Sequence, residues 1–153
     1  MGSELQLAHT FKDHLAPFGL VQFIESPQES GIADAIVALH PQPLREGIPP
    51  PTLARVSWVE FKHEHGWPKR STTQLKLKRF TREQLLFLES WARINGRACV
   101  LLQIDRDYLL FDARSLRRLF DGALRAEIEE SAAMVVTRAN AFPTARVLKW
   151  LTS

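Results

Sequence analysis

Hydrophobic residues recur at helical spacing in several parts of the chain. Leu7, Phe11 and Leu15 follow one another at steps of four, which places them on one face of a helix. Thr81 stands directly before another such segment and is a suitable N-cap for it. Helices are therefore predicted over about residues 4–16, 82–95, 114–120, 123–136 and 143–151.

Short apolar runs between these helices have the composition and length of strands. "RVSWVEFK" alternates apolar and polar positions, and "RACVLLQI" and "YLLFDA" flank the tight turn "DRD". The stretch "HPQPLREGIPPPTLA" holds five prolines, so it is predicted to form an excursion at the end of a hairpin. Strands are predicted over about residues 20–26, 33–39, 55–62, 97–104 and 108–113.

The order of these elements predicts an α/β domain around one central mixed sheet of about five strands. A chain of 153 residues fits a single domain, with 45% hydrophobic and 24% charged residues as in globular proteins. No apolar run approaches the roughly 20 residues of a membrane span, so no membrane association is expected. Cys99 is the lone cysteine and no secretory signal is visible, so a cytoplasmic protein is expected.

Positive charge is concentrated in the segment "KRSTTQLKLKRFTR", residues 69–82, which we call the basic loop. It contains no acidic residue, and such a run suits a polyanion because phosphate contacts release condensed counterions. A solvated loop without a specific role explains the charge equally well. Trp67, in "HGWPKR" just before the loop, is a candidate for stacking on a base. The candidate DNA-binding cations are Lys69, Arg70, Lys76, Lys78, Arg79 and Arg82.

Carboxylates inside apolar segments are costly to bury and therefore point to chemistry. Glu60 and Lys62 are two apart in a predicted strand, so their side chains share one face. If the strand after Asp34 pairs with this one, Asp34 lies next to Glu60, and two such carboxylates suit Mg²⁺. The simpler interpretation is a solvent-facing ion pair and a turn aspartate. The combination of all three residues with apolar strands favours a metal site.

These residues stand in a pattern that resembles the PD-(D/E)XK nuclease superfamily. The resemblance rests on "GIADAIVAL", "WVEFK", "FTREQLLFLESWARINGRACVLLQI" and "YLLFDA", and it covers about residues 4–120. Within the superfamily it is similar to small phage-type VRR-NUC and Holliday-junction-resolvase-like enzymes. It implies a restriction-endonuclease-like core, with residues 121–153 as a helical extension of the same domain. Ala33 stands where the family usually has proline, which removes some backbone rigidity but no ligand.

The resemblance also implies roles for individual residues. Glu4, on the first helix, is its match for a glutamate that completes the site, and Glu25 is the other candidate. The further residues that it implies are Asp34, Glu60 and the backbone carbonyl of Phe61 as metal ligands, Lys62 as the catalytic lysine, and Gln84 as a supporting glutamine.

The expected function is thus a Mg²⁺- or Mn²⁺-dependent endonuclease for branched or structured DNA, encoded by a phage or prophage and active in recombination or repair in the bacterial cytoplasm. Two symmetric incisions in a junction would require a homodimer. The C-terminal segment has apolar residues for such an interface, or for packing on its own sheet. The alternatives are a catalytically silent nucleic-acid-binding module of the same fold, and a repair nuclease for flaps or ordinary duplex.

Overall fold

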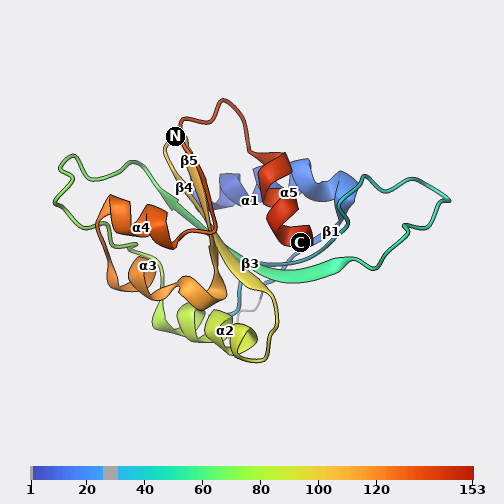
Figure 1. Ribbon diagram of the computed structural model, residues 1–153, viewed down its shortest axis with the longest axis horizontal. Helices are drawn as coiled ribbons and strands as arrows, with labels where there is room; N and C mark the ends of the chain where they lie inside the picture. Colours follow the sequence, from blue (N-terminus) through green and yellow to red (C-terminus); the bar gives the residue numbers. More distant parts are fainter. Residues whose placement is uncertain (1, 26–30) are drawn as a thin grey trace.

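The computed structural model describes residues 2–25 and 31–153. Over these residues the chain forms one mixed sheet with strand order β1-β2-β3-β4-β5-β6 and helices on both faces (Figure 1). The strands are β1 (Gly19–Phe23), β2 (Ala35–Leu39), β3 (Arg55–Glu64), β4 (Ala98–Ile104), β5 (Asp107–Asp112) and β6 (Met134–Val136). The helices are α1 (Glu4–Leu15), α2 (Arg82–Arg93), α3 (Arg117–Asp121), α4 (Arg125–Ser131) and α5 (Thr144–Thr152), with short 3₁₀ turns at Ala16–Phe18 and Ala113–Ser115.

Side-chain caps fix the beginnings of the two longest helices. Ser3 caps α1 by accepting the amide of Gln6 at 3.1 Å. Thr81 caps α2, and Gln84 returns a hydrogen bond to the Thr81 amide, which completes a capping box. Both helices therefore begin where the sequence predicts them.

The sheet changes direction in its middle. Strands β1, β2 and β3 are antiparallel, β3 and β4 are parallel, and β4, β5 and β6 are antiparallel again. The parallel pair requires a crossover, which α2 provides. In the β2–β3 register Ala35 lies opposite Val59, so Asp34, one residue earlier, lies beside the segment that begins at Glu60. The predicted pairing of these two strands is confirmed.

Two apolar layers hold the sheet between its helices. On one face α1 and α5 cover a cluster that includes Phe11, Val37, Phe61 and Leu151. On the other face α2, α3 and α4 cover the second cluster, which includes Leu88 (Figure 1). No helix among the described residues is long and apolar enough to cross a membrane.

The region after α3 differs from the sequence prediction. A single helix was expected over 123–136, but α4 ends at Ser131 and residues Met134–Val136 form the edge strand β6, paired with β5. Because Met134, Val135 and Val136 are apolar and mostly β-branched, they complete the sheet better than they extend a polar helix. The described sheet accordingly has six strands where about five were expected. The helix α5 packs its apolar residues against α1 and the sheet, so that surface is used within the chain.

Two long connections project from opposite ends of the molecule in Figure 1. The proline-rich excursion, residues 40–54, joins β2 to β3 as predicted and is tied to the body by hydrogen bonds from His40 to Phe18 and from Leu44 to Pro17. The other connection, residues 65–81, joins β3 to α2 and contains most of the basic loop. The turn predicted over residues 27–31 lies, apart from Gly31, outside the described residues.

Candidate metal and catalytic site

Asp34 is held directly beside the middle of β3. Its Oδ2 accepts the amide hydrogen of Phe61 at 2.8 Å, and its own carbonyl accepts the amide of Ile24 at 2.9 Å. In an extended strand the N–H and C=O of one residue point to the same edge, so the Phe61 carbonyl is also directed toward Asp34. Two oxygens of the predicted ligand set are thereby brought to one edge of β3.

Glu60 and Lys62 lie on the neighbouring face of β3 and form a buried ion pair. Their side chains are 1% and 3% exposed, and Lys62 Nζ lies 3.0 Å from Glu60 Oε1. Lys62 also donates to the Arg79 carbonyl at 2.9 Å and to Gln84 Oε1 at 3.1 Å. An ammonium has three donors, so Lys62 has an acceptor for each of them. The interpretation of Glu60 and Lys62 as a solvent-facing pair is wrong.

Gln84 connects the helix α2 to this pair. Its Oε1 accepts the Thr81 amide at 3.0 Å, and its Nε2 donates to Glu60 Oε1 at 2.9 Å. The capping box therefore fixes which end of the Gln84 amide faces Glu60. Gln84 thus takes part in capping α2 and also orients the carboxylate of Glu60.

One oxygen of Glu60 is left over. Oε2 is buried and has no hydrogen-bond partner among the described residues, although buried polar atoms nearly always have one. Burial, together with the nearby charge of Asp34, raises the pKa of Glu60 to about 8, against the opposing effect of Lys62. A cation bound at Oε2 would remove both costs.

Glu4, at the start of α1, lies close enough to act on the same charges. Burial raises the pKa of Glu4, Asp34 raises it further, and Lys62 and Arg79 oppose the rise. Glu25 is exposed, and it is not among the charges that act most strongly on the pKa of Glu4 or Glu60. Between the two candidates, the geometry favours Glu4 as the glutamate that completes the site.

The oxygens of Asp34, Glu60 and the Phe61 carbonyl suit Mg²⁺ better than a metal that takes all of its ligands from protein side chains. Within residues 2–25 and 31–153, no three His, Cys, Asp or Glu side chains gather closely enough to hold an ion by themselves. Mg²⁺ commonly takes only one or two carboxylates and fills its other positions with water and phosphate oxygens. Asp34, Glu60 and the Phe61 carbonyl are hard ligands of this kind. The orphaned Oε2 of Glu60 is the observation in favour of such an ion.

A hollow of about 350 Å³ opens beside the buried pair. It is lined by residues of three segments, among them Glu4, Lys62, His63, His65, Lys78 and Arg79. Its lining combines the cations Lys62, Lys78 and Arg79 with the carboxylates of Glu4 and Glu64, whereas Asp34 and Glu60, the partner of Lys62, do not line it. The histidines border this hollow, where they can contact a nucleic acid.

The basic loop is not a free solvated segment. Leu75, Leu77 and Phe80 are buried in the second apolar cluster, while the intervening Lys76 and Lys78 are exposed. The predicted cations Arg79 and Arg82 are exposed beside them, and Lys69 and Arg70 lie further out in the same connection. The apolar residues therefore hold the cations in fixed positions, with Lys78 and Arg79 at the hollow.

Trp67 has a partner that the sequence did not indicate. Its indole N–H donates to Asp107 Oδ2 at 2.8 Å, and the Arg125 guanidinium lies over its ring at 4.6 Å. Asp107 also accepts from the amide of Arg138, so it is a buried anchor as well as a hairpin residue. Stacking of Trp67 on a base stays a prediction, and it requires Arg125 to leave the ring.

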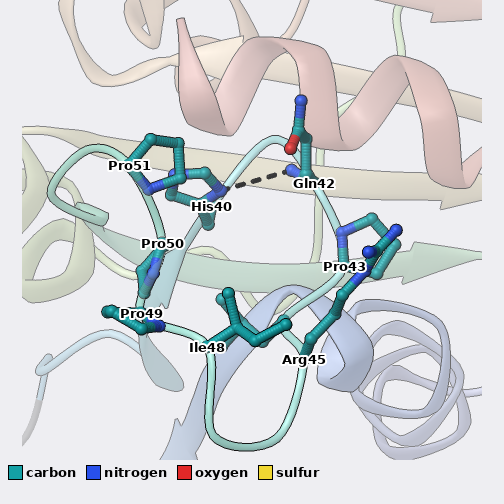
Figure 2. Close-up of a pocket in the computed structure, with 9 residues that line it drawn as sticks. His40, Gln42, Pro43, Arg45, Ile48, Pro49, Pro50 and Pro51 are labelled. Carbon is teal, nitrogen blue, oxygen red and sulfur yellow. Dashed lines mark hydrogen bonds between the residues drawn. The ribbon is translucent and has the colours of Figure 1, made fainter.

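Another hollow, of about 490 Å³, lies in the proline-rich excursion (Figure 2). His40 stands at its base, where Nδ1 accepts the Gln42 amide at 3.4 Å and Nε2 lies 2.9 Å from Thr52 Oγ1. The buried ring thus joins the two ends of the excursion. The prolines and Arg45 around it are exposed, and the hollow is separate from the carboxylates.

Sequence reasoning missed one contributor to the site, the backbone carbonyl of Arg79. A main-chain contact leaves no mark on residue identity, so no motif indicates it. The role of Thr81 was visible as an N-cap followed three residues later by glutamine.

Comparison with known proteins agrees with the architecture. No family model and no curated protein matches the chain. Among solved structures it is similar to Hjc, a Holliday junction resolvase from Archaeoglobus fulgidus, with a TM-score of 0.50 and 13% identity over 83% of this chain and 90% of the other. The chain has a restriction-endonuclease-like fold. The fold predicted from the sequence is thereby confirmed.

Proposed function

We propose that this protein is a metal-dependent endonuclease of the PD-(D/E)XK type that acts on branched DNA. The observation that carries the proposal is the orphaned Oε2 of buried Glu60, beside Asp34 and Lys62. A buried carboxylate oxygen without a partner is costly, and such a cost is tolerated where a ligand satisfies the oxygen. The fold shared with Hjc supports the same class of activity.

In this mechanism Asp34, Glu60 and the Phe61 carbonyl hold Mg²⁺ or Mn²⁺, with Glu4 at the border of the site. The ion supplies polarisation of the phosphate and activation of water. Lys62 stabilises negative charge that develops on the phosphate, and Gln84 keeps Glu60 and Lys62 in register. The exposed cations of the basic loop hold the DNA backbone and make binding depend on salt.

We further propose that the substrate is a Holliday junction or a similar branched DNA, and that the active form is a homodimer. Symmetric cleavage of a junction needs two sites related by a twofold axis. Among the described residues, an exposed apolar stripe on the sheet, on the face opposite α1, is available to a second copy, and we call it the uncovered sheet face. It consists of Leu20, Ala38 and Val56, which lie side by side across β1, β2 and β3, and its leucine and valine are 71% and 52% exposed. A phage or prophage origin, a VRR-NUC relationship and a place in the bacterial cytoplasm belong to the same proposal.

Two other functions use the same fold. A silent binding module would hold DNA on the basic loop without cutting it, and the intact set of Asp34, Glu60 and Lys62 speaks against it. A repair nuclease for flaps or linear duplex would use the same carboxylates on a different substrate.

One experiment separates these functions. The purified protein is incubated with labelled Holliday junction, flap, splayed and linear duplex DNA in Mg²⁺, Mn²⁺ or EDTA. Cleavage of the junction in the presence of metal, and none in EDTA, is expected. Preferred cleavage of flaps or linear duplex selects the repair nuclease, and binding without cleavage in every metal selects the binding module.

A further inference from the structure

We propose that the peptide group between Arg79 and Phe80 is a positioning group for Lys62, which couples the DNA-binding surface to the catalytic lysine. This inference rests on the proposed nuclease function. Of the three acceptors around Lys62, two belong to the Glu60 and Gln84 network, and only the Arg79 carbonyl comes from the basic loop. It is also the shortest of the three contacts, at 2.9 Å.

The carbonyl is presented by a rigid piece of chain. Leu75 and Ala123 exchange two backbone hydrogen bonds of 2.9 and 3.1 Å, which fix the loop to the α3–α4 connection. Gly122 has φ +94°, and a Cβ atom there would lie 3.2 Å from the Cβ of Lys76. Phe80 is buried against Phe120, with ring centroids 5.6 Å apart. The position of the Arg79 carbonyl is thus set by packing well away from the carboxylates.

The side chain and the backbone carbonyl of Arg79 make contacts in different places. The guanidinium is on an exposed residue at the border of the hollow, where it acts on the charge of Glu4. The carbonyl of the same residue accepts from Lys62, which is almost completely buried. A phosphate that docks on the side chain therefore meets a residue whose main chain holds the lysine.

The physical consequence is a balance of forces on the ammonium. Glu60 attracts Lys62 toward the sheet, and the Arg79 dipole attracts it toward the loop. A weaker carbonyl would leave the ammonium held mainly by Glu60 and Gln84, so that charge on the phosphate is stabilised less. Docking of the DNA itself does not use this contact. Weakening this contact is therefore expected to lower kcat and to leave KM nearly unchanged.

The test replaces the peptide bond by an ester. Phe80 is exchanged for phenyllactic acid by nonsense suppression, which makes the Arg79 carbonyl a poorer acceptor and keeps every side chain. Among the described residues the Phe80 amide donates no backbone hydrogen bond, so the ester removes no such contact of its own. The control replaces Thr72 by its own α-hydroxy acid, because within residues 2–25 and 31–153 the carbonyl of Ser71 accepts no backbone hydrogen bond. Arg79→Ala removes the side chain and leaves the carbonyl.

With cleavable junction DNA, the Phe80 ester should lower kcat by about fivefold to tenfold and change KM and DNA affinity by less than about twofold, as expected for a weakened hydrogen bond to a charge. Arg79→Ala should mainly raise KM. The Thr72 ester should match wild type, and the melting temperatures of both ester proteins should agree with it. In a Lys62→Ala background, single-turnover rates with and without the Phe80 ester should be equal, because the coupling partner is gone.

An unchanged kcat in the Phe80 ester, or an equal rate loss in the Lys62→Ala background, would overturn the coupling while wild type still cuts DNA. If wild type cuts no DNA, the nuclease function itself fails and the inference fails with it.

Discussion

The amide of Phe61 donates a 2.8 Å hydrogen bond to Oδ2 of Asp34, a residue 27 positions earlier in the chain. This contact replaces the next backbone pair of the β2–β3 ladder, which ends with Ala35 opposite Val59. The Asp34 side chain thus extends the β2–β3 hydrogen-bond pattern by one step beyond the first residue of β2. The carboxylate is fixed at the edge of β3 before any metal arrives.

Asp34→Asn should abolish binding of Mg²⁺ or Mn²⁺ in calorimetry. The amide oxygen can still accept from Phe61, so the fold should be retained while the negative charge that attracts the ion is lost. Asp13→Asn, at an exposed position of α1, is the control and should bind metal as wild type does. Equal metal affinity in the two variants would exclude Asp34 as a ligand.

Lys62→Ala should lower the cleavage rate by a factor of about 10² or more, because one electrostatic stabiliser of the transition state is removed. Junction affinity should stay within a few-fold, since Lys62 is almost completely buried whereas the cations of the basic loop are exposed. Rates and affinities are measured beside Lys149→Ala, an exposed lysine on α5 that should have no effect. Normal cleavage by Lys62→Ala would refute its catalytic role.

The triple variant Lys76→Ala, Lys78→Ala, Arg79→Ala should weaken DNA binding for all sequences and flatten its salt dependence. The slope of log K against log salt should fall by up to about 0.9 per lost phosphate contact. A second triple variant removes the same charge at Arg45, Arg93 and Lys149, which are exposed in other parts of the molecule. If both triples have the same slope, the basic loop makes no specific phosphate contacts.

Glu60→Gln should make the metal-free protein more stable than wild type at alkaline pH. The folded pKa of Glu60, about 8, lies above its ordinary value of 4.5, so the folded state favours the protonated form. The stability that this preference contributes is fully present below pH 4.5 and is lost as pH rises through about 8. The loss amounts to a few kcal/mol, at about 1.4 per pH unit.

The measurement is denaturant unfolding in EDTA from pH 5 to 9. The difference between Glu60→Gln and wild type should grow from pH 5 to about pH 8 and then level off, whereas Glu46→Gln, at an exposed position, should give a constant difference. Added Mg²⁺ should stabilise wild type only. A pH-independent difference for Glu60→Gln would contradict the raised pKa.

Leu20→Lys should convert the proposed homodimer into monomers in sedimentation experiments. A lysine placed in the uncovered sheet face would have to be buried by a second copy, at a large desolvation cost. Leu5→Lys is the control, because Leu5 is equally exposed but lies on α1, which covers the opposite face. A wild-type monomer at all concentrations, or a dimer that tolerates Leu20→Lys, would remove this interface.

Much of this architecture was predictable because local signals agreed with one another. The alternation in β3 and the pairing of its neighbour suffice to bring Asp34, Glu60 and Lys62 together. The strand β6 was not predictable, since three apolar residues after a polar helix have the same local pattern as another helical turn. Burial of the pair was also hidden, because an E-x-K sequence does not show that α2 and the basic loop close over it. The choice between Glu4 and Glu25 depends on the packing of α1, which no local pattern contains.

The parallel pairing of β3 with β4 has a consequence for how the protein is made. A chain that has left the ribosome only as far as Lys62 already carries both carboxylates and the lysine, yet nothing encloses Glu60. Gln84 and the Arg79 carbonyl emerge afterwards, and β4 can pair with β3 only after the crossover helix between them has been synthesised. Until these later residues are present, Glu60 lacks the groups that bury and orient it. The enclosure of Glu60 therefore depends on residues that are synthesised after both carboxylates and the lysine.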